Sequence, residues 1–383
     1  MNPPIIYLDN NATTRVDPRV AQAMLPLLTE RYGNPSSAHH FGAQVAAEVE
    51  QARRQVADLI GARESEIVFT SGGTEADNLA LRGVLAAHPD RGHVVISAVE
   101  HHAVFELCEH LEHAGLAVTR VGVDREGRLD FGQLETSLRD DTALVSIMLA
   151  NNETGVIFPL REVAELAGSR GVLVHTDAVN AIGKMPVDVE KLGVDLLSLS
   201  AHKFHGPKGC GALWIRRGTP FRAMQIGGSQ ERGRRGGTLN APGIIGMGTA
   251  CAILRELGDS AMSRCRTLRD RLEAELRRIC PDVHICGQHA DRLPNTTCAC
   301  FPGLRSEAIL ILLSEAGICV SSGSACTSGS LEPSHVLRAM GIDARVAQGQ
   351  IRFSLGRFNT DADIDRLLEV LPKVLQKVAA ANI

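Results

Sequence analysis

Aromatic residues are scarce in this sequence: Phe, Tyr and Trp make up only 3% of its 383 residues. Proteins that bind single-stranded nucleic acid stack bases on aromatic side chains, so this scarcity argues against such a platform. A marked excess of positive charge is also missing, because the formal net charge is −4 at pH 7. The sequence therefore gives no indication of nucleic acid or an anionic membrane as a partner.

The sequence also lacks an apolar run of about 18 residues, the length needed to span a bilayer. The segment 1–7 has no basic stretch followed by an apolar one, so no signal peptide is indicated. We therefore expect a cytoplasmic protein. The ten cysteines include no Cys-x-x-Cys pair, and in a reducing compartment most of them are expected to be small buried groups.

Short apolar runs alternate with helix-like segments over the first two-thirds of the chain. The predicted strands cover residues 66–70, 93–97, 118–123, 143–149, 172–175, 195–200 and 210–215. Predicted helices between them include 75–85, 104–114 and 160–169. This alternation predicts an α/β fold with a mostly parallel sheet, covered by helices on both faces because several strands are apolar throughout.

The pattern changes in the last third of the chain. Long helices are predicted at 240–256 and 260–278, followed from about residue 281 by a compact α+β unit that ends in a helix at 361–380. A chain of this length exceeds one small core. We expect a large domain of residues 15–258 and a small domain formed by residues 1–14 and 259–383.

A lysine, Lys203, follows directly on the predicted strand 195–200. Burial disfavours an ammonium group and lowers the pKa of a lysine, which Schiff-base chemistry requires. Taken alone, a lysine at this position is more often a surface lysine after a strand. The interpretation of Lys203 as a cofactor anchor rests on the features that accompany it.

An aspartate, Asp177, ends an earlier apolar strand and precedes Lys203 by about one βαβ unit. Neighbouring strand ends would place the two together. Such a carboxylate can pair with the pyridinium nitrogen of pyridoxal 5′-phosphate (PLP) and sustain the ring as an electron sink. The alternative is a turn former or helix cap.

Two further loops follow strands. Segment 70–77 has glycines that lead into a helix, and a helix N-terminus of this kind binds phosphate. The alternative is a capping box from Thr74 to Asp77. His101, in segment 97–103, could stack on a planar cofactor. A metal site at His101 and His102 is not favoured, because adjacent histidines point in different directions.

The cysteine Cys326 lies in segment 321–330, which consists almost entirely of small, mostly polar residues. Such a stretch is expected to form a mobile surface loop, where a thiol can act as a nucleophile. The other nine cysteines are interpreted as structural. Cys298 and Cys300 should share one strand face, but a lone Cys-x-Cys pair is weak evidence for a metal.

Together these motifs resemble the cysteine desulfurases of the NifS/IscS type, which are class V, fold-type I PLP enzymes. The resemblance covers essentially the whole chain. It rests on YLDNNATT (7–14), GNPSS (33–37), SGGTE (71–75), EH (100–101), NNETG (151–155), HTDA (175–178), SLSAHK (198–203), QERGRR (230–235), SSGSACTSGSLEPSH (321–335) and IRFSLGR (351–357).

The resemblance implies a role for each matching residue. Lys203 would hold PLP as a Schiff base, Asp177 would pair with the pyridine nitrogen, and His101 would stack on the ring and assist proton transfer. Arg352 would bind the carboxylate of L-cysteine, and Cys326 would receive its sulfur as a persulfide. The remaining expected cofactor contacts are Gly73, Thr74, Asn152 (also at the substrate), Asn180, Ser200, His202 and, from the other subunit of a homodimer, Thr238.

The chain departs from the family pattern at two positions. Asn180 replaces a glutamine that normally hydrogen-bonds the phenolate oxygen of PLP, and the shorter amide would reach that oxygen through water. Ser229 replaces a histidine and is assigned no role. The sequence alone leaves open a class V aminotransferase, a selenocysteine lyase or a sulfur-relay protein without chemistry of its own.

Within the family, Ser328-Gly329-Ser330 and the short C-terminus look closer to NifS than to IscS. This resemblance favours a role in nitrogenase maturation. It implies an iron–sulfur scaffold protein as sulfur acceptor, with Cys326 as a transient cluster ligand.

Overall fold

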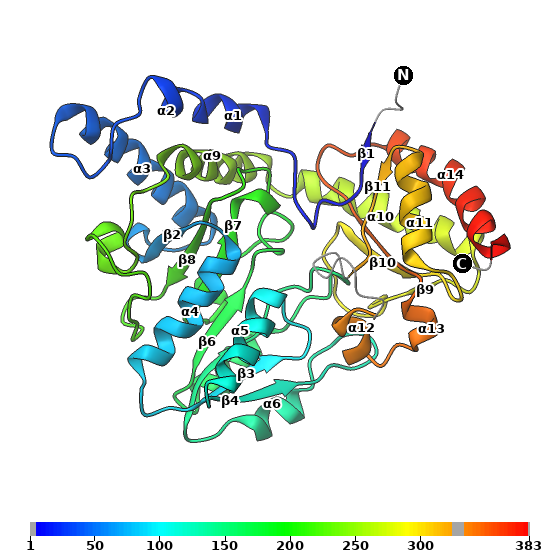
Figure 1. Ribbon diagram of the computed structural model, residues 1–383, viewed down its shortest axis with the longest axis horizontal. Helices are drawn as coiled ribbons and strands as arrows, with labels where there is room; N and C mark the ends of the chain where they lie inside the picture. The colour runs from blue at the N-terminus through cyan, green and yellow to red at the C-terminus, as the bar shows by residue number, and fades with distance from the viewer. Residues whose placement is uncertain (1–4, 324–332, 382–383) are drawn as a thin grey trace.

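The computed structural model describes residues 5–323 and 333–381, and Figure 1 shows two lobes side by side. The larger lobe is built on a seven-stranded sheet of order β2-β8-β7-β6-β5-β3-β4. Its strands are β2 (Ile67–Thr70), β3 (His93–Ser97), β4 (Ala117–Val121), β5 (Thr142–Ser146), β6 (Leu173–Asp177), β7 (Leu196–Ser200) and β8 (Gly211–Ile215). Strand β8 is antiparallel to both its neighbours and the other pairings are parallel, which confirms the predicted sheet.

Helices cover both faces of this sheet, as the apolar strands predict. Along β3, Val94 and Ile96 pack against α4 and α5, whereas Val95 between them packs in the cluster that includes α3, α7 and α9. Successive side chains of a strand point to opposite faces, so one strand contributes to both clusters. The helices of this lobe are α1 (Pro18–Met24), α2 (Pro26–Thr29), α3 (His40–Leu59), α4 (Gly73–Ala87), α5 (His102–His113), α6 (Phe131–Ser137), α7 (Leu160–Gly168), α8 (Val189–Leu192) and α9 (Ala241–Leu257).

One edge of the sheet collects the carboxyl ends of its parallel strands. Strands β2 and β7 end at this same edge, because Thr70 and Ser200 both pair with Gly211 of β8. The chain passes closely here: a Cβ on Gly211 would lie 2.8 Å from backbone atoms of Gly72 and Leu199. In open α/β sheets, ligands bind outside the carboxyl ends of the strands. This edge is therefore where a site is expected.

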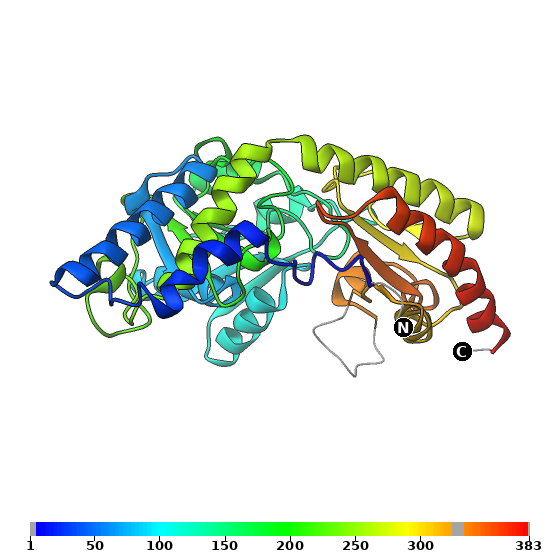
Figure 2. The same ribbon diagram turned by 90° about the horizontal axis from the view of Figure 1, so that it is seen from above.

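The smaller lobe contains an antiparallel sheet of order β12-β10-β9 and a parallel pair, β1 with β11. Its apolar cluster joins Leu8 near the N-terminus with Leu272 of α10, Phe353 of β12 and Leu371 of α14. Helices α10 and α14 lie next to each other in Figure 2. The elements are β1 (Ile6–Tyr7), β9 (His284–Ile285), β10 (Thr296–Cys300), β11 (Ile318–Cys319), β12 (Gln350–Ser354), α10 (Ser260–Ile279), α11 (Ser306–Glu315), α12 (His335–Ala339), α13 (Ala344–Ala347) and α14 (Asp361–Ala380).

Residues 8–14 run from one lobe to the other. Asn10 Nδ2 donates to the carbonyl oxygen of Ser354 at 2.9 Å, and Thr14 Oγ1 donates to that of His202 at 2.8 Å. The exact domain division expected from the sequence stays a prediction. Within the described ranges, no helix is both long and apolar enough to cross a membrane.

Candidate active site

A cavity of about 270 Å³ lies at the edge of the sheet where β5, β6 and β7 end. It brings together most of the residues that the sequence singles out. Those lining it are Gly73, Thr74, His101, Asn152, Asp177, Asn180, His202 and Lys203, together with Ala12, Asp77, Met148, Ala150 and Val179.

Lys203 reaches this cavity from the short 3-10 helix η2 (Ala201–Lys203), which follows β7. Its Nζ donates to the carbonyl oxygens of Asn11 at 2.5 Å and Ala12 at 3.1 Å. The side chain is half-buried. Lys203 is therefore held at the cavity and is not an ordinary surface lysine.

Asp177 is the last residue of β6 and lies beside β7, where it pairs with Ser198. The predicted placement of Asp177 and Lys203 at neighbouring strand ends is therefore correct. The Asp177 carboxylate is buried and accepts a hydrogen bond from the backbone N–H of Val179 at 2.8 Å. Burial raises the pKa of Asp177 to about 6, against the opposing effect of that hydrogen bond and the charge of Lys203.

A second buried carboxyl group, Asp77, lies beside Asp177. Ligand atoms of Asp77, Asp177 and His101 lie within 4.8 Å of one another. Asp77 Oδ1 makes no hydrogen bond within the described part of the chain and lies 3.7 Å from His175 Nε2. Burial, and then the charge of Asp177, raises the pKa of Asp77 well above its usual value.

The capping alternative for Asp77 is wrong, because the N-cap of α4 is Gly72 and Asp77 lines the cavity instead. The spacing of Thr74 and Asp77 along the helix predicts that the two residues interact. The neighbour of Asp77 in the structure is instead Asp177, which lies 100 positions away in sequence. The sequence does contain one indication that Asp77 is buried, because its carboxylate lies on the apolar face of the predicted helix 75–85.

His101 is the N-cap of α5, and its Nδ1 accepts from the backbone N–H of Ala103 at 3.1 Å. Burial, and then the charge of Lys203, lowers the pKa of His101 to about 4. The ring is therefore neutral at pH 7, and its proton is on Nε2 because Nδ1 is an acceptor. A neutral ring at the wall of the cavity is suited to stacking on a planar group.

Glu100, next to His101, is buried beneath this loop. Its Oε1 accepts from Ser97 Oγ at 2.5 Å and from the backbone N–H of Met148 at 2.9 Å. Burial raises the pKa of Glu100 to about 8, so the group is protonated at neutral pH. Glu100 thus joins the loop after β3 to the segment after β5.

An adjoining cavity of about 390 Å³ shares Gly73, Thr74 and His202 with the first. It also contains Ser200 and Lys208, and it lies at the N-terminus of α4. Free backbone N–H groups and the helix dipole make such a terminus favourable for a phosphate. Thr238 is exposed and lines neither cavity.

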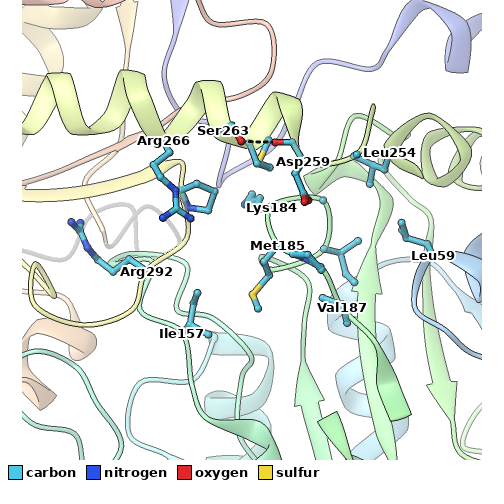
Figure 3. Close-up of a pocket in the computed structure, with 16 residues that line it drawn as sticks. Leu59, Ile157, Lys184, Met185, Val187, Leu254, Asp259, Ser263, Arg266 and Arg292 are labelled. Carbon is cyan, nitrogen blue, oxygen red and sulfur yellow. Dashed lines mark hydrogen bonds between the residues drawn. The ribbon is translucent and has the colours of Figure 1, made fainter. Parts of the chain in front are cut away.

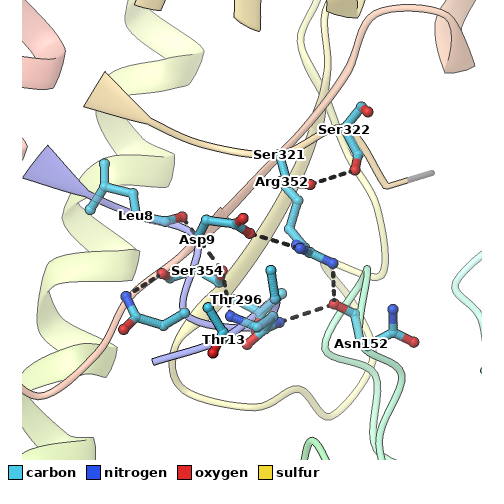
Figure 4. Close-up of polar contacts among 12 residues, drawn as sticks. Leu8, Asp9, Thr13, Asn152, Thr296, Ser321, Ser322, Arg352 and Ser354 are labelled. Atoms are coloured by element: carbon cyan, nitrogen blue, oxygen red, sulfur yellow. Dashed lines mark hydrogen bonds and ion pairs between the residues drawn. The ribbon is translucent and has the colours of Figure 1, made fainter. Parts of the chain in front are cut away.

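Arg352, in β12, lies next to the cavity and does not line it. Figure 4 shows its guanidinium between Asp9, at 2.8 Å from Oδ1, and the carbonyl oxygen of Asn152, at 3.2 Å. Its Nε makes no hydrogen bond to any described residue. Arg352 is therefore fixed beside Asn152, and Asp9 is a contact that the sequence motifs did not indicate.

Asn180 lines the cavity, and its Oδ1 accepts from Lys184 Nζ at 2.7 Å. Lys184 is buried and lines a separate cavity of about 460 Å³, shown in Figure 3. Lys184 belongs to none of the sequence motifs described above. Its only local signal is a lone charge in an otherwise apolar turn.

Cys326 lies outside the described residues. The described residues on either side of it are placed near the site: a Cβ on Gly323 would collide with Gln350 and Glu153, and His335 Nε2 contacts the carbonyl oxygen of Glu100 at 2.9 Å.

Cys298 and Cys300 do lie on one face of β10, and Cys286 joins them so that the three Sγ atoms lie within 4.8 Å. All three thiols are buried. Only the long-range pairing of β9 with β10 brings Cys286 to this cluster.

The cavity fits PLP in charge and in hydrogen bonding. Lys203 offers an amine, the buried Asp177 carboxylate offers a partner for a protonated ring nitrogen, and the N-terminus of α4 offers an anion site. The flat face of His101 and the amide of Asn180 complete the walls. Lys203 would anchor the aldehyde of PLP, Asp177 its ring nitrogen and the N-terminus of α4 its phosphate. His101 and Asn180 would contact the ring.

Comparisons with known proteins give consistent matches. Residues 6–367 match the family model described as Aminotransferase class-V. The chain is 52% identical over 378 residues to the cysteine desulfurase of Trichormus azollae, covering 99% of this chain and 94% of that protein. It is 49% identical over 374 residues to the cysteine desulfurase NifS of Azotobacter vinelandii, covering 97% and 93%. A solved structure of a NifS-like protein has a TM-score of 0.92 at 42% identity, covering 97% of this chain and 100% of that one.

Proposed function

The chain belongs to the class-V aminotransferase family, among its fold-type I cysteine desulfurases, and from this membership we propose that it takes sulfur from L-cysteine to yield L-alanine. The observation that carries the proposal is the single cavity shared by Lys203, Asp177 and His101. PLP is the cofactor we propose, and when bound it withdraws electrons from the substrate Cα.

Lys203 has two proposed tasks, to anchor the cofactor and to carry the substrate Cα proton on Nζ. Its contacts with the backbone of Asn11 and Ala12 keep the amine at the cavity wall. Lys203 serves the aldehyde of PLP, whereas Asp177 serves its ring nitrogen. The negative charge of Asp177 keeps that nitrogen protonated. Neutral His101 stacks on the ring and can exchange a proton at Nε2.

Arg352 and Asn152 are the proposed carboxylate-binding residues. Asp9 and the carbonyl oxygen of Asn152 hold the guanidinium by Nη2 and Nη1. A fixed guanidinium binds a carboxylate with good geometry. This arrangement favours an amino acid substrate whose α-carboxylate enters from the side of β12.

Cys326 is the proposed sulfur acceptor within the chain. Its thiolate attacks the substrate sulfur, so a new S–S bond forms while the substrate C–S bond breaks, and the freed carbon is protonated to give alanine. The balance is cysteine plus enzyme thiol giving alanine plus enzyme persulfide. Support comes from the resemblance of segment 321–335 to the family motif and from the placement of Gly323 and His335 beside the site.

The persulfide then passes to an acceptor, which we propose is an iron–sulfur scaffold protein in nitrogenase maturation, with Cys326 as a transient cluster ligand. The identity of 49% with the NifS of Azotobacter vinelandii supports this choice. A discriminating test is to add purified scaffold and iron to the enzyme with cysteine. Cluster formation on the scaffold that fails with Cys326→Ala supports the proposal, and equal transfer by that variant would refute it.

We further propose a homodimer in which Thr238 reaches the phosphate of the other subunit. Thr238 is exposed, and the large apolar side chains of Leu25, Leu28, Tyr32 and Ile226 are exposed on the same lobe. Exposed apolar groups of this kind mark interaction surfaces when they cluster. Sedimentation equilibrium should give twice the 41.0-kDa chain mass, and a monomer would contradict the proposal.

The proposed reaction is tested by incubating the PLP-loaded protein with L-cysteine and a thiol reductant, which reduces the persulfide and releases its outer sulfur as sulfide, and by measuring alanine and sulfide together. We expect both, and we expect Cys326→Ala to abolish them. Turnover of L-cysteine that is fully retained in Cys326→Ala, without loss of sulfur from the substrate, would favour a class V aminotransferase. A purified protein without a visible cofactor band would favour a sulfur-relay protein, and preferred turnover of selenocysteine would favour a selenocysteine lyase.

A further inference from the structure

Lys184 is a buried lysine that the proposed reaction does not use. It lies in the turn after β6, four residues beyond Asn180, and only 5% of it is exposed. Its Nζ donates to Asn180 Oδ1 at 2.7 Å and to Asn11 Oδ1 at 2.8 Å. Figure 3 shows Lys184 at the cavity of about 460 Å³, whereas Asn180 lines the cavity that contains Lys203. Lys184 therefore lies outside the cavity that contains Lys203 and contacts one of the residues that line it, Asn180.

The Asn11 end of this contact is fixed independently. Asn11 Nδ2 donates to the carbonyl oxygen of Asn152 at 3.0 Å and to Thr296 Oγ1 at 2.9 Å. Asn11 Oδ1 must then face Lys184, and it also accepts from Asn295 Nδ2 at 3.1 Å. The position of Lys184 Nζ is thus set by a hydrogen-bonded group that spans both lobes.

The Asn180 end is set by Lys184. A lysine side chain donates hydrogen bonds, so the amide atom next to it is the oxygen. The Nδ2 end of Asn180 consequently points away from Lys184, and among residues 5–323 and 333–381 it donates no hydrogen bond. Because Asn180 lines the cavity, this free donor is available there.

Protonation does not alter this arrangement. Burial, and then the charges of Lys203 and Arg352, lowers the pKa of Lys184 well below its usual value, with an opposing effect from Cys265. A neutral amine keeps two N–H groups, enough for the two amide oxygens that it contacts. Both hydrogen bonds therefore persist whether Lys184 is charged or neutral.

We propose that Lys184 is a positioning residue, which turns the Asn180 amide so that Nδ2 faces the cavity and donates toward the phenolate oxygen of bound PLP. This inference rests on the proposed function, because it takes PLP as the ligand. It gives the short Asn180 side chain a defined donor role at the position where the family usually has glutamine. Lys184 itself touches neither PLP nor the substrate.

The test is the pH midpoint of the visible absorption band in the PLP-loaded protein. Loss of a donor makes the phenolate oxygen more basic, so the chromophore keeps its proton to higher pH. We expect K184M to raise the midpoint by about one pH unit, the size of one hydrogen bond to a charged oxygen. K191M, at an exposed lysine of α8, should leave it unchanged.

Double substitution separates positioning from charge. If Lys184 acts through Asn180, N180A alone and N180A combined with K184M should have the same midpoint. An additive shift, or an unchanged midpoint in K184M, would overturn the proposal. Should K184M fail to fold, N180A decides, because alanine offers no donor and adds no charge: the midpoint must rise, and an unchanged one overturns the proposal.

This titration does not depend on turnover. A protein that binds PLP and shows the predicted shifts, but forms no alanine from cysteine, would refute the proposed function and leave the role of Lys184 intact. Normal alanine formation with unshifted midpoints would support the proposed function and refute the role of Lys184. The two proposals therefore fail separately.

Discussion

At the scale of single residues, the site depends on opposite charges at neighbouring strand ends, Asp177 on β6 and Lys203 after β7. We expect Lys203→Ala to lose the visible absorption band and to slow alanine formation by at least about 10³-fold, because general acid–base catalysis alone contributes about 10²–10⁴-fold. Lys191→Ala, at an exposed lysine, is the matched control. Retention of both the band and the rate in Lys203→Ala would rule out the assigned anchor.

Glu100 gives a pH prediction for the PLP-free protein. The pKa of Glu100 is raised from 4.5 to about 8 by burial, so between these values the folded protein holds a proton that the unfolded chain releases. The stabilising contribution is present below about pH 4.5 and is lost as pH rises through about 8, with a slope of up to about 1.4 kcal/mol per pH unit.

Glu100→Gln removes this proton exchange, so the free energy of unfolding of the variant should fall less steeply between pH 6 and 8 than that of the wild type. Urea denaturation at pH 6, 7 and 8 measures both slopes. Glu135→Gln, at an exposed position of α6, should keep the wild-type slope. Identical slopes in Glu100→Gln and the wild type would show that Glu100 is ionised in the folded protein.

The sequence predicted some of these residues and missed others for a physical reason. Asp177 and Lys203 each follow an apolar strand, and the parallel topology of consecutive strands then places them together. Asp77 and Lys184 have no such local pattern. Their environments depend on which distant side chains surround them: His175 and Asp177 for Asp77, and Asn11 for Lys184.

At the scale of elements, a buried ion pair joins α3 to the short 3-10 helix η3 (Gln230–Gly233), which precedes Thr238. Arg53 makes two contacts with Glu231, at 2.7 and 2.8 Å, and Glu231 also accepts from the backbone N–H of Phe69 at 2.7 Å. The φ of Glu231 is +47°, in the left-handed region that non-glycine residues rarely adopt. The ion pair thus holds a strained segment.

We expect Glu231→Gln to lower the free energy of unfolding by about 3 kcal/mol, because it leaves the buried Arg53 guanidinium without its buried charged partner. Glu50→Gln is a matched control, since Glu50 pairs with the same guanidinium but has 43% of its side chain exposed. It should cost less than about 1 kcal/mol. Equal losses in the two variants would mean that burial of the ion pair does not matter.

Elements with a strong periodic pattern were predicted closely, and α14 begins and ends where its pattern does. The predicted strand 172–175 extends two residues further, because Thr176 and Asp177 also pair with β7. The predicted strand 143–149 ends at Ser146. The segment after it bends into the cavity wall, where Met148 and Ala150 contribute lining atoms.

At the scale of the whole molecule, we propose that residues 15–258 form one domain and residues 1–14 with 259–383 the other. The N-terminal segment supports this division, since β1 pairs with β11 and Leu8 belongs to the apolar cluster of the smaller lobe. Asn10 adds hydrogen bonds to the Ser354 carbonyl and to Asn359 Oδ1 at 2.9 and 3.3 Å.

Asn10→Ala should therefore loosen the smaller lobe selectively. We expect amide hydrogen exchange in β11 and β12 to accelerate about tenfold, the effect of about 1.4 kcal/mol from lost hydrogen bonds. Exchange in β6 and β7 should remain at the wild-type rate. Equal acceleration of exchange in β11 and β12 and in β6 and β7 would show that the two lobes unfold as one unit.

The proposed reaction requires Lys203 and Cys326 to act on one substrate molecule, and sulfur tracing tests this most directly. The PLP-loaded protein is given less than one equivalent of sulfur-labelled L-cysteine, quenched within one turnover, and its peptides are mapped by mass spectrometry. We expect labelled sulfur on Cys326 in an amount equal to the alanine formed, and no label in Lys203→Ala. Alanine without label on Cys326, or label on another cysteine such as Cys319, would contradict it.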